Sequence, residues 1–342
     1  MFKENKSTCL SVVNNMFSFF LIILLFFSCS SPKKTTAQTI LEPNIRIGVA
    51  WRSDTTSSTF RGTLMAIREA GAEPVVIGPI LSPDIVYDGD SINPVCLDEP
   101  GILKPEYADI IKRDTYKGID VRGQYLNNID AIVFPGGEDM SPALFTNPQP
   151  WHGIEEEIYY DPKRDVSDYI LMSWCLDNDM PMLCICRGMQ VLTILSGSPM
   201  IQDLAAFFHQ QDLPYNFEHR GQTEEGRCFA CHDVNITDTT SILYNIVGST
   251  VIHDTPSWHH QAAEFVNNPN LKVTAVTNTS GIDIIEAVER TDKTWVVGIQ
   301  FHPEIAVKKH LENASDASQF MTYEEGMKYF HALVNIVKKS KN

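Results

Sequence analysis

The sequence predicts an α/β protein, a three-layer sandwich in which helices cover both faces of a mostly parallel central sheet. From Ile45 onward, short apolar runs alternate with helical patterns, as in a sheet that is packed on both faces. The first run, helix and second run form a β-α-β unit, which favours parallel pairing. Further along, Cys186 stands at a strand-to-helix junction. We expect one domain, residues 45–338.

The first part of this domain begins with a regular strand, helix and strand, and an irregular segment follows from residue 78. We expect a strand at 45–51, a helix at 59–70 that ends at Gly71, and a strand at 74–78. Residues 78–128 contain scattered Pro and Gly and only one short helix, at 105–113. A connection of this length is a lid or an insertion. We interpret it as an insertion near the mouth of the site.

The second part returns to regular elements. Strands are expected at residues 130–134, 182–185, 233–237, 272–277, 284–289 and 295–300. Helices are expected at residues 166–176, 188–195 and 323–337. No repeat and no second domain boundary is visible, so these elements belong to the same domain.

The N-terminus has the composition of an export signal. Lys3 and Lys6 precede a strongly apolar run over residues 16–28. The run is shorter than the roughly 20 residues that span a bilayer, which favours the core of a signal peptide over residues 1–28.

Cys29 follows this signal directly. Ser28 before it is similar to the small residue of a bacterial lipobox, although Phe26 and Phe27 replace the usual residues. We expect lipidation at Cys29 and a polar tether over residues 29–44. This predicts a protein of the bacterial cell envelope, anchored to a membrane by lipid and facing the periplasm. The alternative is an uncleaved anchor or simple secretion.

Composition and charge narrow the class further. With 43% hydrophobic and 20% charged residues, the chain is typical of a globular protein. Its formal net charge of −16 repels phosphate backbones, so nucleic acid is not an expected partner.

A lone C-x-x-C motif, Cys228 and Cys231, is followed by His232. One such pair without a second is weak support for zinc. A local disulfide or two unpaired thiols is the more ordinary interpretation.

The segment PMLCICRGMQ, residues 181–190, joins a strand to a helix through Cys186. The nearby helix N-terminus favours a thiolate, which makes Cys186 a candidate nucleophile. Gly188 allows close packing of the helix, and the N–H of Arg187 can donate to an oxyanion. The alternative is a buried structural cysteine.

The segment GIQFHPE, residues 298–304, places His302 just beyond an apolar strand, with Glu304 two residues later. A thiol nucleophile needs a base, and the base needs an acceptor that fixes its orientation. His302 and Glu304 fit these two roles, although a lone histidine at a strand end is more often structural.

In FPGGEDMSP, residues 134–142, two glycines follow a strand. Without a Cβ, they allow the backbone to approach a ligand. Gly137, with Gly136 beside the substrate, is the candidate for the second oxyanion donor. An ordinary tight turn is the alternative.

Taken in order, PGGEDMSP, CICRGMQ, SWHHQA and GIQFHPE resemble the class I glutamine amidotransferase-like superfamily and its nucleophile elbow. SWHHQA resembles the gamma-glutamyl-gamma-aminobutyrate hydrolase branch, and Arg164 and Asp165 match that branch's Arg-Asp pair. The resemblance covers residues 45–337. In two respects the chain departs from it: Cys184 replaces a usual glycine, and segment 78–128 is longer.

The resemblance implies a cysteine-dependent γ-glutamyl hydrolase. Cys186 attacks the γ-carbonyl of a small γ-glutamyl substrate, His302 protonates the leaving amine, and water releases glutamate from the thioester. No metal or organic cofactor is required. At the pocket wall the resemblance implies substrate-binding residues: Gln190, His259, His260 and Gln261.

Two other functions remain as alternatives. A glutaminase subunit that feeds ammonia to a partner synthase is one, and export argues against it because such ATP-dependent synthases are cytoplasmic. The other is a lipoprotein that binds γ-glutamyl or peptidoglycan-derived ligands without cutting them. It has no need of Cys186, His302 and Glu304 together. The oligomeric state, a homodimer included, stays open.

Overall fold

The computed structural model describes residues 44–99, 101–146, 148, 150–151 and 155–341. The chain divides into two units, Met1–Glu42 and Pro43–Asn342. The predicted signal peptide, lipidation of Cys29 and nearly all of the tether fall in the first unit, outside the described residues, and stay predictions. Among the described residues, no helix is both long and apolar enough to cross a membrane.

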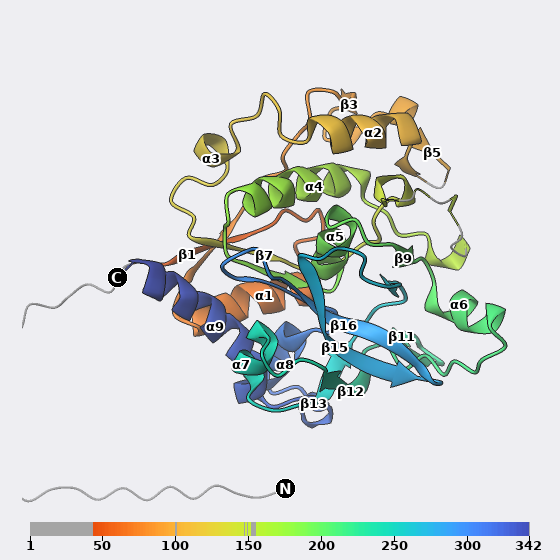
Figure 1. Ribbon diagram of the computed structural model, residues 1–342, viewed down its shortest axis with the longest axis vertical. Helices are drawn as coiled ribbons and strands as arrows, with labels where there is room; N and C mark the ends of the chain where they lie inside the picture. Colours follow the sequence, from red (N-terminus) through yellow and green to blue (C-terminus); the bar gives the residue numbers. More distant parts are fainter. Residues whose placement is uncertain (1–43, 100, 147, 149, 152–154, 342) are drawn as a thin grey trace, which may run out of the picture. The chain divides into compact units, whose positions relative to one another are not determined.

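A nine-stranded sheet forms the centre of the described part of the second unit (Figure 1). Its order is β13-β12-β15-β16-β17-β8-β7-β1-β2. These strands are β1 Arg46–Val49, β2 Glu73–Val76, β7 Ala131–Phe134, β8 Met182–Ile185, β12 Ala230–Ile236, β13 Val251–Ser257, β15 Leu271–Thr279, β16 Ile282–Arg290 and β17 Val296–Ile299.

The sheet is mixed, not mostly parallel as expected. Strands β17, β8, β7, β1 and β2 pair in parallel with one another, whereas β13, β12, β15 and β16 pair antiparallel, and β16 also pairs antiparallel with β17. Only Ser280 and Gly281, both with positive φ, connect β15 to β16. A two-residue hairpin forces antiparallel pairing, because parallel strands need a long crossover.

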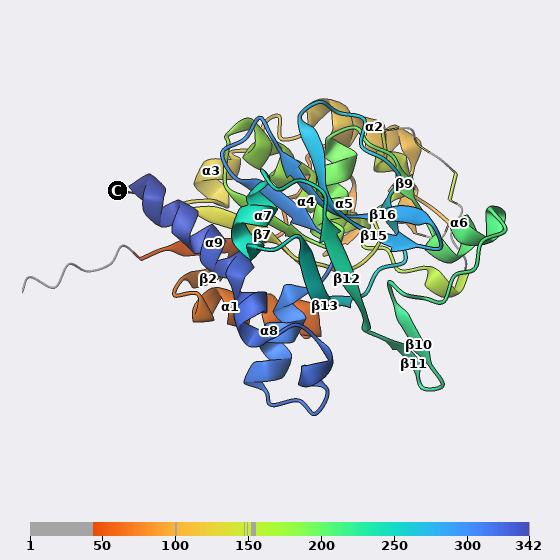
Figure 2. The ribbon, with the colours of Figure 1, turned by 60° about the horizontal axis from the view of Figure 1, so that its bottom comes forward.

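Helices cover both faces of the sheet, which confirms the predicted three-layer α/β class (Figures 1 and 2). On one face lie α4 Pro162–Asp177 and α5 Arg187–Leu195; on the other lie α1 Ser58–Glu69, α8 Pro303–Leu311 and α9 Tyr323–Lys341. Side chains of β7 alternate between the two cores: Ile132 and Phe134 face the first, and Ala131 and Val133 face the second. This period of two is the normal pleat of a buried strand.

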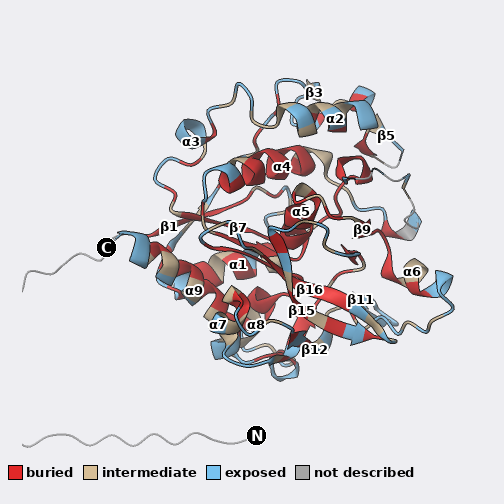
Figure 3. Cartoon of the chain, in the orientation of Figure 1, coloured by how far each residue is buried: buried red, intermediate tan, exposed pale blue. Residues whose placement is uncertain are grey.

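The described residues of segment 78–128 cover the outer face of α4. They form α2 Pro105–Asp114, α3 Val121–Gln124, β3 Tyr87–Asp88, β4 Ser91–Ile92, β5 Leu97–Asp98 and β6 Ile102–Leu103. The Ile80 N–H donates to Ser167 Oγ of α4 at 3.0 Å, and residues 164–173 of α4 are buried on all sides, as the colour of α4 in Figure 3 shows. The expected position near the mouth of the site is wrong, because apolar residues of the segment belong to the core around α4.

Outside segment 78–128, several further elements were not predicted from the sequence. They are α8, β13, and the shorter α6 Leu204–Gln210, α7 Ile242–Val247, β9 Met200–Ile201, β10 Gly221–Thr223, β11 Gly226–Cys228 and β14 Ala262–Ala263. Strand β13 contains Pro256 and lies at the edge of the sheet, where a missing N–H is tolerated. A proline within a run argues against a strand, which explains why β13 escaped prediction.

Candidate active site

Cys186 occupies the sharp turn between β8 and α5. Its backbone has φ 50° and ψ −107°, a strained conformation for a residue with a Cβ. The Cys186 N–H donates to the Ile299 carbonyl of β17 at 2.7 Å, which holds the turn against the sheet. Because Cys186 directly precedes α5, its thiol lies at a helix N-terminus, where a thiolate is favoured.

His302 reaches the same point from the neighbouring strand. It follows β17 as the N-cap residue of α8, and its Nδ1 lies 2.6 Å from Glu304 Oε1. Both side chains are almost fully buried. The carboxylate accepts from Nδ1 and so directs Nε2 the other way. His302 and Glu304 therefore have the expected mutual arrangement.

Gly136 lies between Cys186 and His302. A Cβ at this position would come within 2.6 Å of His302 Cε1 and 3.3 Å of Cys186 Cβ. Only glycine allows this close approach. Gly136 was expected beside the substrate, whereas the structure uses it to bring the two side chains together.

Electrostatics favour a protonated His302. Burial lowers the pKa of His302, but the negative charges of Glu304 and Cys186 outweigh burial and raise this pKa to about 10. An imidazolium next to a cysteine stabilises its thiolate. His302 therefore carries a proton at neutral pH that it can give to a leaving group.

A buried ionic network stabilises the turn at Cys186 on the side of α4. The Arg187 side chain pairs with Asp168 and, at 2.7 Å, with Asp165 of α4. Arg164 pairs with Glu138 and donates to the Pro135 carbonyl at 2.8 Å. Such a network fixes the chain that carries the glycines and Cys186.

We predict that Arg187→Met lowers the free energy of unfolding by about 3–5 kcal/mol, because it removes the cation paired with buried Asp165 and leaves buried Asp168 with Arg164 alone. Urea denaturation measures the loss. The control is Arg113→Met, which removes an exposed partner of Asp114 and should leave stability nearly unchanged. Equal stability of the two variants would show that the network contributes little.

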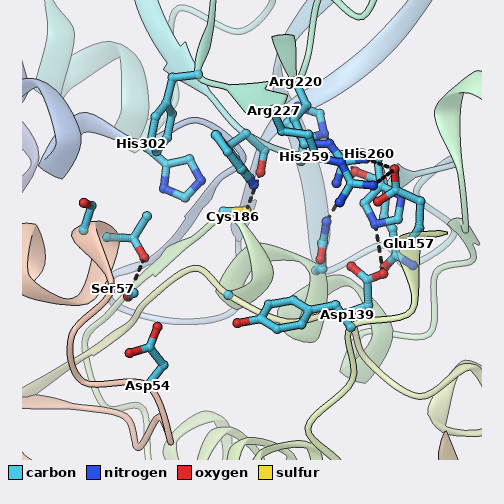
Figure 4. A pocket seen from close by; sticks show the side chains of 18 of the residues that line it. Asp54, Ser57, Asp139, Glu157, Cys186, Arg220, Arg227, His259, His260 and His302 are labelled. Atoms are coloured by element: carbon cyan, nitrogen blue, oxygen red, sulfur yellow. Dashed lines mark hydrogen bonds and ion pairs between the residues drawn. The ribbon is translucent and has the colours of Figure 1, made fainter. Parts of the chain in front are cut away.

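A cavity of about 590 Å³ opens above Cys186 (Figure 4). Seven of the ten residues predicted around the site line it: Gly137, Cys186, Gln190, His259, His260, Gln261 and His302. The other three, Gly136, Arg187 and Glu304, are not among the lining residues. None of the described residues of segment 78–128 lines it.

The predicted wall residues have partners within the chain. His259 Nδ1 lies 2.8 Å from the Gln261 carbonyl, which also accepts from Gln190 Nε2 at 3.3 Å. His260 lies between Asp139, at 2.9 Å, and Asp203, at 3.1 Å. Burial lowers the pKa of His260, but these two carboxylates raise it to about 9. His260 is thus a charged, fixed part of the wall.

Sequence reasoning missed several lining residues, Arg52, Asp54, Glu157, Arg220 and Phe229 among them. Arg52 and Asp54 follow β1, and the carboxyl ends of parallel strands meet at one edge of a sheet, so their position was a usable signal. Glu157 and Arg220 come from irregular segments and pair at 2.6 Å. Nothing local in the sequence marked them.

Comparison with known proteins agrees with this architecture. Residues 115–304 match the peptidase C26 family, and this range includes Gly137, Cys186, His302 and Glu304. The chain belongs to the peptidase C26 family. This membership supports hydrolase activity, and it confirms the predicted superfamily.

Individual relatives are moderately similar. Protein NtpR of Enterococcus hirae is 31% identical over 197 residues, 57% of this chain and 74% of the relative. The gamma-glutamyl-gamma-aminobutyrate hydrolase of Escherichia coli O157:H7 is 28% identical over 185 residues, 53% of this chain and 66% of the relative. The solved glutamine amidotransferase of Thermotoga maritima is 14% identical, with a TM-score of 0.45 over 86% of this chain and 99% of its own.

Proposed function

We propose that this chain hydrolyses γ-glutamyl amide bonds, with Cys186 as nucleophile, His302 as general acid and base, and Glu304 as the residue that orients His302. The observation that carries the proposal is the arrangement of Cys186, His302 and Glu304 beside one cavity. A cysteine at a strained elbow faces a cavity beside a buried histidine whose other nitrogen is held 2.6 Å from a carboxylate. These are the three parts that cysteine acyl transfer requires.

In the first half of the reaction, the Cys186 thiolate attacks the γ-carbonyl carbon of the substrate. Negative charge moves to the carbonyl oxygen, where the N–H groups of Gly137 and Arg187 donate. Arg187 is the first residue of α5, so its N–H has no partner within the helix. The C–N bond then breaks, and the proton on His302 Nε2 goes to the leaving amine.

In the second half, water attacks the glutamyl thioester. His302, now neutral, accepts a proton from this water, the C–S bond breaks, and glutamate and the thiolate are released. Among the described residues, His302 Nε2 is buried and has no hydrogen-bond partner. That atom is therefore available for both proton transfers.

The γ-glutamyl group is supported by the cavity and by one relative. A γ-glutamyl end carries an α-amino and an α-carboxylate charge, and the cavity is lined by both acidic and basic side chains, such as Asp54 and Arg220. The Escherichia coli relative is named a gamma-glutamyl-gamma-aminobutyrate hydrolase.

Two isomeric substrates test this proposal. They share one leaving amine and join it to either the γ- or the α-carboxyl of glutamate. We expect kcat/KM to be at least about 100-fold higher for the γ-isomer, because a displaced carbonyl loses its oxyanion donors. Cys186→Ala, run on both isomers, controls for contaminating peptidases.

Equal cleavage of the isomers, or cleavage of only the α-isomer, would leave the family correct and the substrate wrong. Preference for free glutamine over γ-glutamyl amides of larger amines would favour the glutaminase alternative.

A further inference from the structure

Three histidines and one glutamate form a buried cluster next to the cavity. His219 precedes β10, His232 lies on β12, His259 follows β13, and Glu286 lies on β16. One ligand atom of each residue lies within 4.8 Å of the others. His219 and Glu286 are 0% exposed and His259 is 3% exposed. Four separate segments thus bring donor atoms to one point that the proposed reaction does not use.

The three ring nitrogens converge on one oxygen of Glu286. Glu286 Oε1 lies 3.1 Å from His219 Nδ1, 3.5 Å from His259 Nε2 and 3.6 Å from His232 Nε2. These contacts have the range of ion pairs but not the alignment of regular hydrogen bonds, and within the described chain the three nitrogens and both Glu286 oxygens have no well-aligned hydrogen-bond partner. Burying so many unsatisfied polar atoms costs free energy. One bound group that interacts with all of them would remove this cost.

In His232 and His259, the partner of Nδ1, the ring nitrogen that points away from the cluster, shows that Nδ1 carries a proton. His259 Nδ1 lies 2.8 Å from the Gln261 carbonyl; a carbonyl only accepts, so Nδ1 carries the proton. His232 Nδ1 lies 3.2 Å from the hydroxyl of Thr277, which itself donates to the Asp233 carbonyl at 2.8 Å. That hydroxyl can only accept from His232.

With the proton on Nδ1, a neutral His232 or His259 turns a bare Nε2 lone pair toward the Glu286 carboxylate. Lone pairs and a carboxylate repel one another unless a cation lies between them. A histidine that donates its outer N–H to a carbonyl or hydroxyl while its other nitrogen points to a common centre has the arrangement of a metal ligand.

We propose that His219, His232, His259 and Glu286 bind one divalent transition-metal ion of the zinc class. Two ligands of a tetrahedral zinc ion, each at about 2.0–2.1 Å, are about 3.3 Å apart, close to the 3.1–3.6 Å between Glu286 Oε1 and the three nitrogens. Imidazole suits zinc, copper and nickel. Four ligands from the chain close the coordination sphere, so the role of the ion is structural.

The ion would hold the wall of the cavity in place. His259 stands between Trp258, whose carbonyl oxygen lies 3.8 Å from Cys186 Sγ, and the lining residues His260 and Gln261. Fixing His259 to β12 and β16 would fix this segment beside the nucleophile.

The C-x-x-C motif supplies no thiolate from Cys231 to this site. Successive side chains on β12 point to opposite faces, and Cys231 Sγ lies 3.1 Å from the Gln319 carbonyl, away from the cluster. His232 is thus the part of that motif that serves the ion, in a role that the spacing of the cysteines did not indicate.

The test uses the full chain, stripped of metal with a chelator and then titrated with ZnCl2 or CoCl2. We expect one equivalent to bind, by plasma mass spectrometry, and a rise in Tm of about 5 °C at saturation. X-ray absorption of the zinc form should show only nitrogen and oxygen ligands, with imidazole scattering. The cobalt form should show tetrahedral d–d bands without thiolate charge transfer.

Variants locate the ion. Glu286→Gln and His232→Ala should each weaken binding by at least about 10-fold, whereas Cys231→Ser and Cys186→Ala, which remove nearby thiols, should bind as the wild type does. Failure of the folded chain to bind either ion, sulfur among the ligands, or binding that survives Glu286→Gln and disappears in Cys231→Ser would overturn the proposal. If the ligand variants do not fold, the wild-type spectra decide alone.

Discussion

Replacing Cys186 with alanine should lower kcat/KM for a γ-glutamyl amide by about 10⁴-fold or more, because it removes the covalent route itself. The fold should persist. The thiol is small, and its hydrogen bond in the structure is a long contact of 3.8 Å to the Trp258 carbonyl. Steady-state kinetics, together with thermal unfolding of the same preparation, measures both effects.

Cys184 supplies the matched control. It is a fully buried thiol two residues earlier on β8, and burial raises its pKa well above the ordinary range, so it cannot serve as the nucleophile. Cys184→Ala should keep activity within about tenfold of the wild type, since the change is small and conserves packing. Near wild-type turnover by Cys186→Ala would contradict the mechanism, whatever the control shows.

Removing the base should be nearly as severe. We expect His302→Ala to lower kcat/KM by about 10³–10⁴-fold, since both the proton for the leaving amine and the base for water are lost. An intact Tm would show that chemistry, and not the fold, accounts for the loss. A reduction of less than tenfold would remove His302 from the reaction.

The variant Glu304→Gln tests how Glu304 orients His302, apart from the proton transfers that His302 itself makes. Activity should fall less, by about 10–100-fold, because the amide keeps the size of the side chain but loses its charge. In the wild type, kcat/KM should fall as pH rises through the His302 pKa of about 10, where the proton for the leaving amine is lost. The charge of Glu304 raises this pKa, so in Glu304→Gln the alkaline limb should move to lower pH. An unmoved limb would show that Glu304 acts only through packing.

The features predicted correctly from the sequence are those that local residues determine. Four apolar residues, 182–185, a cysteine and a glycine-containing helix specify an elbow, and His302 with Glu304 lies just beyond the next strand. These segments need no knowledge of distant neighbours, because strand length and helix start depend on adjacent residues.

The features that were missed depend on contacts between distant segments. The cluster takes His232 and Glu286 from antiparallel strands and His219 and His259 from segments outside the strands. The prediction of a mostly parallel sheet included strands in this region but missed their antiparallel pairing. Two bulges in the pairing of β15 with β16 also shift which side chains face inward. No spacing in the chain reveals such a cluster.

Segment 78–128 illustrates a third kind of error. Its irregular composition suggested an insertion near the mouth of the site, yet residues such as Ile80 and Leu103 are fully buried around α4. A long connection without strong periodicity can still fold against a helix when its apolar residues are scattered, and periodicity does not report on such packing.

Covalent labelling tests the central claim most directly. The active protein is treated with a glutamine-analogue electrophile, digested and examined by peptide mass spectrometry. The account predicts a single adduct on Cys186, blocked by excess γ-glutamyl substrate and absent in Cys186→Ala, while the exposed thiol of Cys231 stays unmodified. An adduct on another cysteine that removes activity, or full inactivation with Cys186 unmodified, would contradict it.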